Sequence, residues 1–161
     1  IPPFEALLGQ EPAALAGRDD HGITLHHYRD VGASIASGSF QHDGMVIVPC
    51  SNNSLASVAT GVSNNLLHRA ANVTLKERRK LVLCHREMPL SLIEIRNMQT
   101  VTEAGGIICP ANPGFYMLPK SVDEVVDFVA GRLLDLLGVE HNLATRWTRS
   151  PANHRSDETG K

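Results

Sequence analysis

The sequence has few aromatic residues and few cysteines, and its charges nearly cancel. Aromatic residues make up 4% of the 161 positions, and there are three cysteines. An odd, small number of cysteines argues against a disulfide framework, so we interpret Cys50, Cys84 and Cys109 as reduced thiols of a cytoplasmic protein. The net charge of −2 argues against nucleic acid as a partner. No apolar run has the length of a membrane span and we see no signal peptide, so we expect no membrane partner.

No spacing of histidine, cysteine or carboxylate residues matches a metal site. The sequence therefore predicts no metal, and we interpret the eight histidines as surface or packing residues.

Three short apolar runs alternate with helical patterns along the chain. The runs cover residues 45–48, 81–84 and 107–109, and the helical patterns cover 55–71, with a possible break at 61–65, then 89–104 and 121–137. This alternation predicts an α/β fold with a parallel sheet and helices on both faces, that is, a three-layer Rossmann-like (flavodoxin-like) architecture. Alternating residues at 23–28 suggest a further strand. We expect one domain over residues 1–147 and a polar tail over 148–161.

The first apolar run leads into a polar turn and a helix. Ser51, Asn52, Asn53 and Ser54 are all residues that cap helices, and a helix N-terminus at the end of a parallel strand is a common anion site. An ordinary capped turn would have the same sequence.

The other two apolar runs also end in polar loops, at residues 85–87 and 112–116, so we expect all three loops to meet at one edge of the sheet. Arg86 is suited to a phosphate and Glu87 to acid or base chemistry, unless both belong to an ordinary exposed loop. Tyr116 can donate to a ligand or simply pack.

Cationic side chains are concentrated in one segment of this slightly acidic chain. Arg69, Lys76 and residues 78–80 form either a solvated helix face or a phosphate clamp. Arg132 lies near the apolar face of the last helical pattern and therefore needs an anion, from the protein or from a ligand. Trp147 either covers a ligand or packs.

The chain between Tyr28 and Trp147 resembles the UbiX/Pad-type flavin prenyltransferases, a family of flavoproteins. The resemblance rests on six motifs in order: ASGS at 36–39, GMVIVPCS at 44–51, RAANVTLKERR at 69–79, LVLCHREMPL at 81–90, PANPGFY at 110–116 and RLLDLLG at 132–138.

The resemblance implies an enzyme that joins the dimethylallyl group of dimethylallyl phosphate to reduced FMN, without a metal. The prenylated FMN then serves a UbiD-type decarboxylase, and members assemble as dodecamers with sites between subunits. By position, residues 51–54 and Arg86 would hold FMN. Glu87, Lys76, Arg69 and Tyr116 would be catalytic, and Tyr116, Arg132 and Trp147 would bind the prenyl donor.

Members of the family begin with a strand, a glycine-rich loop and a helix that this sequence does not contain. We therefore interpret the sequence as a fragment lacking the N-terminal βαβ segment. Two other functions remain open: an FMN-dependent decarboxylase of the same fold, and a non-catalytic flavin-binding or assembly subunit.

Overall fold

The computed structural model describes residues 24–143 and 145. Its strands are β1 (Met45–Cys50), β2 (Leu81–His85) and β3 (Ile107–Ile108), and its α-helices are α3 (Asn52–Thr60), α4 (Leu66–Lys76), α5 (Leu92–Glu103) and α6 (Val122–Leu137). Two short 3-10 helices, η1 (Ser34–Ala36) and η2 (Phe115–Met117), complete the described elements.

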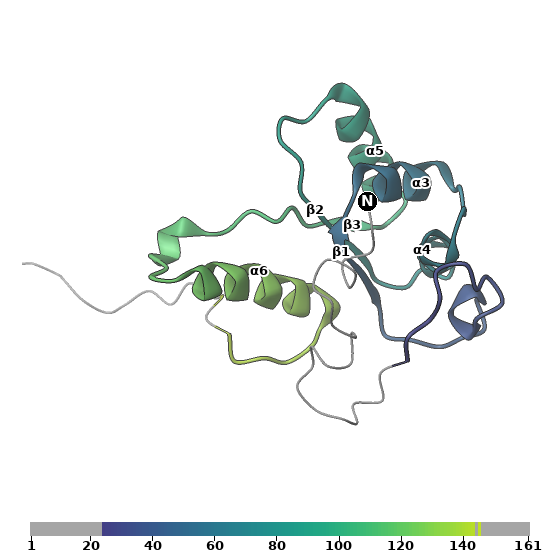
Figure 1. Cartoon of the computed structure of the whole chain (residues 1–161), viewed down its shortest axis with the longest axis horizontal. Helices are drawn as coiled ribbons and strands as arrows, with labels where there is room; N and C mark the ends of the chain where they lie inside the picture. The colour runs from purple at the N-terminus through teal and green to yellow at the C-terminus, as the bar shows by residue number, and fades with distance from the viewer. Residues whose placement is uncertain (1–23, 144, 146–161) are drawn as a thin grey trace, which may run out of the picture.

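The three strands form a parallel sheet in the order β1-β2-β3. Each strand is followed by a helix, as right-handed crossovers between parallel strands require. The predicted α/β architecture is therefore confirmed, with the sheet lying between helices on its two faces (Figure 1).

Successive residues of β2 point to opposite faces of the sheet, and each face has its own apolar cluster. Leu81 and Leu83 pack with Leu55 of α3, Ala71 of α4 and Val101 of α5. On the other face, Val82 and Cys84 pack with Leu133 of α6. All five residues of β2 are buried, which is typical of the central strand of a parallel sheet. As a result, α4 and α6 lie on opposite faces.

Helix boundaries follow capping residues in the sequence. Ser51, Asn65, Ser91 and Ser121 each accept a hydrogen bond from a backbone N–H of the helix that follows. Glu94 completes a capping box at α5. At α6 the backbone N–H of Glu124 donates to Ser121, but the Glu124 carboxylate accepts from the backbone N–H of Lys120, so the capping box there is only half formed.

Some boundaries differ from the sequence-based prediction. Residues 61–65 do break the helical pattern, which becomes α3 and α4. The strand proposed at 23–28 is wrong for the described residues 24–28, which form irregular chain and the start of a turn. The first strand continues through Pro49 to Cys50, with a register irregularity between Ile47 and Cys50. The proposed tail at 148–161 lies outside the described residues.

Within residues 24–143 and 145, no helix combines the length and the apolar character needed to cross a membrane.

Candidate functional site

The loops that follow β1 and β2 are joined by the side chain of Asn52. Its Oδ1 lies 2.6 Å from Nε2 of His85, and its Nδ2 donates to Oε2 of Glu87 over 2.9 Å. The loop after β3 joins the same edge, since the backbone N–H of Ala111 donates to the carbonyl of His85 over 3.0 Å. The predicted convergence of the three loops is thereby observed.

The N-terminus of α3 offers hydrogen-bond donors at this edge. Ser51 caps the helix by accepting from the backbone N–H of Ser54 over 3.2 Å. The N–H groups of Asn52 and Asn53 have no acceptor within the helix, because they belong to its first turn. The hydroxyl of Ser54 also lies 3.3 Å from Nε2 of the buried His68 on α4, which ties this turn to the neighbouring helix.

A cavity of about 480 Å³ opens at this edge of the sheet. It is lined by the loop after β2, by Met98 of α5 and by the loop after β3. Arg86 lines this cavity and also a second, largely apolar cavity of about 420 Å³ between the strand ends and α6. An exposed guanidinium and the free N–H groups of a helix N-terminus at the same sheet edge each suit a phosphate monoester, and the apolar cavity suits an aromatic ring. The donor set therefore fits a flavin mononucleotide.

The cysteines near this edge are poor nucleophiles. Burial raises the pKa of Cys50 to about 12, and burial also raises the pKa of Cys84 and of Cys109. All three are free thiols. At neutral pH they remain protonated, and only the thiolate is an effective nucleophile.

The predicted cations of α4 both bond other groups of the same chain. Nε of Arg69 donates to the carbonyl of Ala36 over 3.2 Å, and Nζ of Lys76 lies 2.6 Å from the carboxylate of Glu77. Hydrogen bonds and charge from Lys76 lower the pKa of Glu77. Arg79 donates to the carbonyls of Phe40 and Gly38, so this member of the basic segment fastens the loop before β1.

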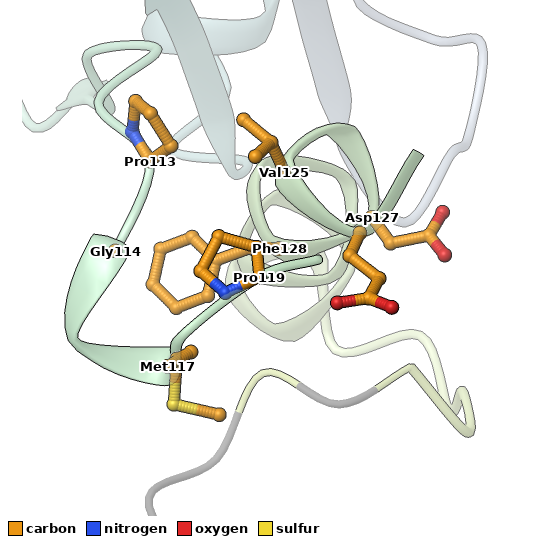
Figure 2. Close-up of a pocket in the computed structure, with 8 residues that line it drawn as sticks. Pro113, Gly114, Met117, Pro119, Val125, Asp127 and Phe128 are labelled. Atoms are coloured by element: carbon orange, nitrogen blue, oxygen red, sulfur yellow. The ribbon is translucent and has the colours of Figure 1, made fainter. Parts of the chain in front are cut away.

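Tyr116 lies on η2, which packs along α6. Its ring meets that of Phe128 edge to face, with centroids 6.0 Å apart. Figure 2 shows Phe128 between this segment and the helix, beside a small cavity of about 120 Å³. A Cβ on Gly114 would lie 2.6 Å from the Phe128 ring, so only glycine allows the segment to approach this closely. Tyr116 remains 59% exposed, and packing against α6 sets its place.

Arg132 is exposed on α6 and forms an ion pair with Asp135 over 2.8 Å. The anion that Arg132 contacts in this structure is therefore a carboxylate of the protein. Arg132 and the α4 cations lie on helices that cover opposite faces of the sheet. Trp147 lies outside the described residues.

Two histidines are more than the surface or packing residues that we expected. His68 and His85 are both buried, at 1% and 2% exposed, and both bond side chains of the turn after β1. The position of His85 at the end of an apolar run was the available signal, because a buried imidazole needs a polar partner. Burial lowers the pKa of His68, which favours its neutral form.

The sequence of this chain is similar to those of known proteins. A family model described as Flavoprotein matches residues 21–134. The chain is 50% identical over 135 residues to the flavin prenyltransferase UbiX of Halalkalibacterium halodurans, covering 84% of the chain and 66% of that relative. It is 53% identical over 127 residues to the UbiX of Thermoplasma acidophilum, covering 78% and 71%.

The structure of this chain is also similar to solved structures of UbiX-like proteins. The structure of AnUbiX in complex with FMN and dimethylallyl pyrophosphate is 45% identical with a TM-score of 0.75, covering 77% of this chain and 66% of that one. A dodecameric FMN-dependent UbiX-like decarboxylase from Escherichia coli O157:H7 is 47% identical with a TM-score of 0.75, covering 77% and 67%. The chain thus spans about two thirds of the length of several relatives that it matches. It belongs to the flavoprotein family that includes the UbiX flavin prenyltransferases.

Proposed function

We propose that the protein transfers the dimethylallyl group of dimethylallyl phosphate to reduced FMN. The observation that carries this proposal is the junction at Asn52, which brings the turn at 51–54 and Glu87 together at the carboxyl edge of the sheet. Relatives about half identical to this chain are named flavin prenyltransferases, and one solved neighbour contains FMN together with a prenyl diphosphate.

In this proposal the N-terminus of α3 and Arg86 hold FMN. Ser51, Asn53 and Ser54 provide hydroxyl, amide and backbone donors on one side, and Arg86 provides a charged donor between the two cavities. Bound reduced FMN supplies the nucleophilic ring positions that accept the dimethylallyl group. The apolar cavity lined by Val48, Ala111 and α6 excludes water from an allylic cation.

Cleavage of the donor C–O bond leaves inorganic phosphate, whose charge needs several fixed donors. In this proposal Arg69, Lys76, Tyr116 and Arg132 supply them, and Trp147 takes part in binding the prenyl donor. Glu87 moves protons, to the leaving phosphate or during ring closure, because its carboxylate faces the cavity at the end of β2.

Because α4 and α6 cover opposite faces, we infer that the donor cations come together between copies of the chain. Exposed apolar side chains support self-association: Met88 is 85% exposed and Ile93 is 70% exposed near α5, and Leu118 is 80% exposed beside η2. A homo-oligomer follows, and a dodecamer is the form of one solved neighbour. We further propose a cytoplasmic protein whose product serves a UbiD-type decarboxylase.

The test is anaerobic incubation of the protein with reduced FMN and dimethylallyl phosphate, followed by mass spectrometry of the flavin. The expected product is heavier than reduced FMN by one dimethylallyl group less one hydrogen. The matched reaction without the prenyl donor should return FMN unchanged. Unmodified FMN in both reactions contradicts the proposal.

A second candidate is an FMN-dependent decarboxylase, since one solved neighbour carries that description. It predicts release of carbon dioxide from an added phenylacrylic acid by the protein and FMN alone. The transferase predicts release only after prenylated FMN passes to a separate decarboxylase. A subunit that only binds flavin would give neither product.

A further inference from the structure

We propose that His85 is a positioning residue that orients Glu87 through the side chain of Asn52. This inference rests on the proposed role of Glu87 in proton transfer. The ring of His85 bonds the amide of Asn52 rather than Glu87, so His85 acts on the reacting groups only indirectly.

His85 is the last residue of β2 and is held firmly. Its ring is 2% exposed, and its backbone carbonyl accepts from Ala111, while the residue pairs with Cys50 across the sheet. A side chain that starts from a central strand and is packed on all sides has little freedom to move. The ring of His85 therefore holds a fixed position from which to orient Asn52 and, through Asn52, Glu87.

The direction of these bonds follows from the charge on Glu87. An ionised carboxylate only accepts, so the Asn52 amide must present Nδ2 to Oε2 of Glu87, at 2.9 Å. Its Oδ1 then faces His85 at 2.6 Å, and an amide oxygen also only accepts. Hence Nε2 of His85 carries a proton and donates it. The two bonds together fix both the amide and the tautomer.

Glu87 needs this support because it lies on an exposed loop. Its Oε2 accepts from Asn52, and its Oε1 accepts from the backbone N–H of Met88 over 3.1 Å. The Met88 bond comes from the adjacent residue and moves with the loop. Among the residues that the structure describes, only Asn52 links the Glu87 carboxylate to the sheet, through the buried His85. Removing the His85 donor frees the amide to rotate and therefore removes that link.

Kinetics of two His85 variants in the full-length protein test the role. His85→Leu removes the donor in a similar volume, whereas His85→Gln places an amide N–H near the position of Nε2. We call the hydrogen bonds from His85 through Asn52 to Glu87 the relay. We expect kcat for prenyl transfer to fall about tenfold in His85→Leu, since one hydrogen bond of the relay is lost. KM for dimethylallyl phosphate should remain unchanged, and His85→Gln should recover most of the rate. Equal kcat in the wild type and His85→Leu overturns the inference.

A double-mutant comparison separates an indirect role from a direct one. Asn52→Ala changes a half-buried residue, so it tests the relay even if His85→Leu does not fold. Acting through Asn52, His85→Leu should cause no further loss in an Asn52→Ala background. If the loss of kcat in the double variant equals the product of the losses in the two single variants, the relay is contradicted.

Crystal structures of the wild type and the two His85 variants give a readout that does not depend on turnover. We expect the Asn52 amide and the Glu87 carboxylate to keep their orientation in His85→Gln and to lose it in His85→Leu. An unchanged Glu87 in His85→Leu overturns the inference whatever the reaction is. If the relay behaves as expected but the wild type makes no prenylated FMN, the proposed function fails and the positioning of Glu87 by His85 stands.

Discussion

Asn52 bonds side chains 33 and 35 residues away in the sequence, whereas Arg132 bonds Asp135, three residues along its own helix. The two residues represent two regions of the candidate site. The flavin region, at the ends of β1 and β2, is built by long-range hydrogen bonds over a buried core. The donor region consists of Arg69 and Lys76 on α4 and Arg132 on α6. Lys76 and Arg132 pair with carboxylates one and three residues away, and Arg69 donates to the backbone carbonyl of Ala36.

The difference shows which parts of the site one chain can organise alone. In the flavin region, the side chains of Asn52 and Glu87 are oriented without a ligand, because hydrogen bonds connect them to His85 at the end of the buried strand β2. In the donor region, the cations are on opposite faces of the sheet, so the proposed function requires that several copies assemble to bring them to one phosphate. The substitutions below test whether the flavin region and the donor region differ in this way.

Glu87→Gln should have the largest effect. It removes the carboxylate that the relay orients, so we expect the rate of prenyl transfer to fall by about 10²- to 10⁴-fold, as for loss of a general acid or base. FMN affinity, followed by fluorescence quenching, should change little. Glu103→Gln on α5 is the matched control and should retain full turnover. A Glu87→Gln variant with the wild-type rate removes Glu87 from the chemistry.

Leu83→Ala should weaken the flavin region as a whole. Leu83 is 0% exposed beneath α3, and truncation of such a side chain costs about 3 kcal/mol of unfolding free energy. Chemical denaturation measures the loss. Val122→Ala, at a position 77% exposed at the start of α6, should leave stability almost unchanged. Equal effects of the two substitutions would show that the core does not lie where the structure places it.

Arg132→Ala tests the donor region. We expect KM for dimethylallyl phosphate to rise about tenfold, because a charged hydrogen bond to the phosphate is lost. Stability should fall by about 1 kcal/mol or less, since the Arg132 side chain is 46% exposed and Asp135 keeps its second partner, His141. Steady-state kinetics and denaturation measure the two quantities. A clear loss of stability with an unchanged KM makes Arg132 a structural residue only.

Two serine caps give the smallest and most closely matched comparison. Ser51→Ala and Ser121→Ala each remove a hydroxyl that accepts a hydrogen bond from a helix N-terminus, at a cost of about 1 kcal/mol. Only Ser51→Ala should also weaken FMN binding, because α3 begins at the flavin region. Titration with FMN measures this. Equal affinities of the two variants would separate the α3 terminus from the flavin.

Much of this fold could be predicted from local pattern. The apolar runs at 45–48, 81–84 and 107–109 identified the strands, and the polar loops after them identified the carboxyl edge. The partners of His68 and His85 could not be predicted, since Ser54 and Asn52 are remote in sequence and only packing brings them together. Local spacing also gave no sign that α4 and α6 would take opposite faces.

The proposed strand at 23–28 failed for a related reason. Alternation favours a strand only if a neighbouring strand is there to pair with it, and in the described residues 24–28 the backbone bonds instead to the start of α4, where the N–H of Leu66 donates to the carbonyl of Tyr28.

Mixed oligomers test the contrast between the two regions most directly. Arg69→Ala and Arg132→Ala proteins would be assayed for prenylated FMN separately and after co-assembly from equal amounts. If the donor cations meet between copies, about a quarter of the sites in random mixtures regain both arginines, and turnover rises well above that of either variant. If one chain supplies both arginines to the same site, co-assembly restores nothing, which would contradict the account.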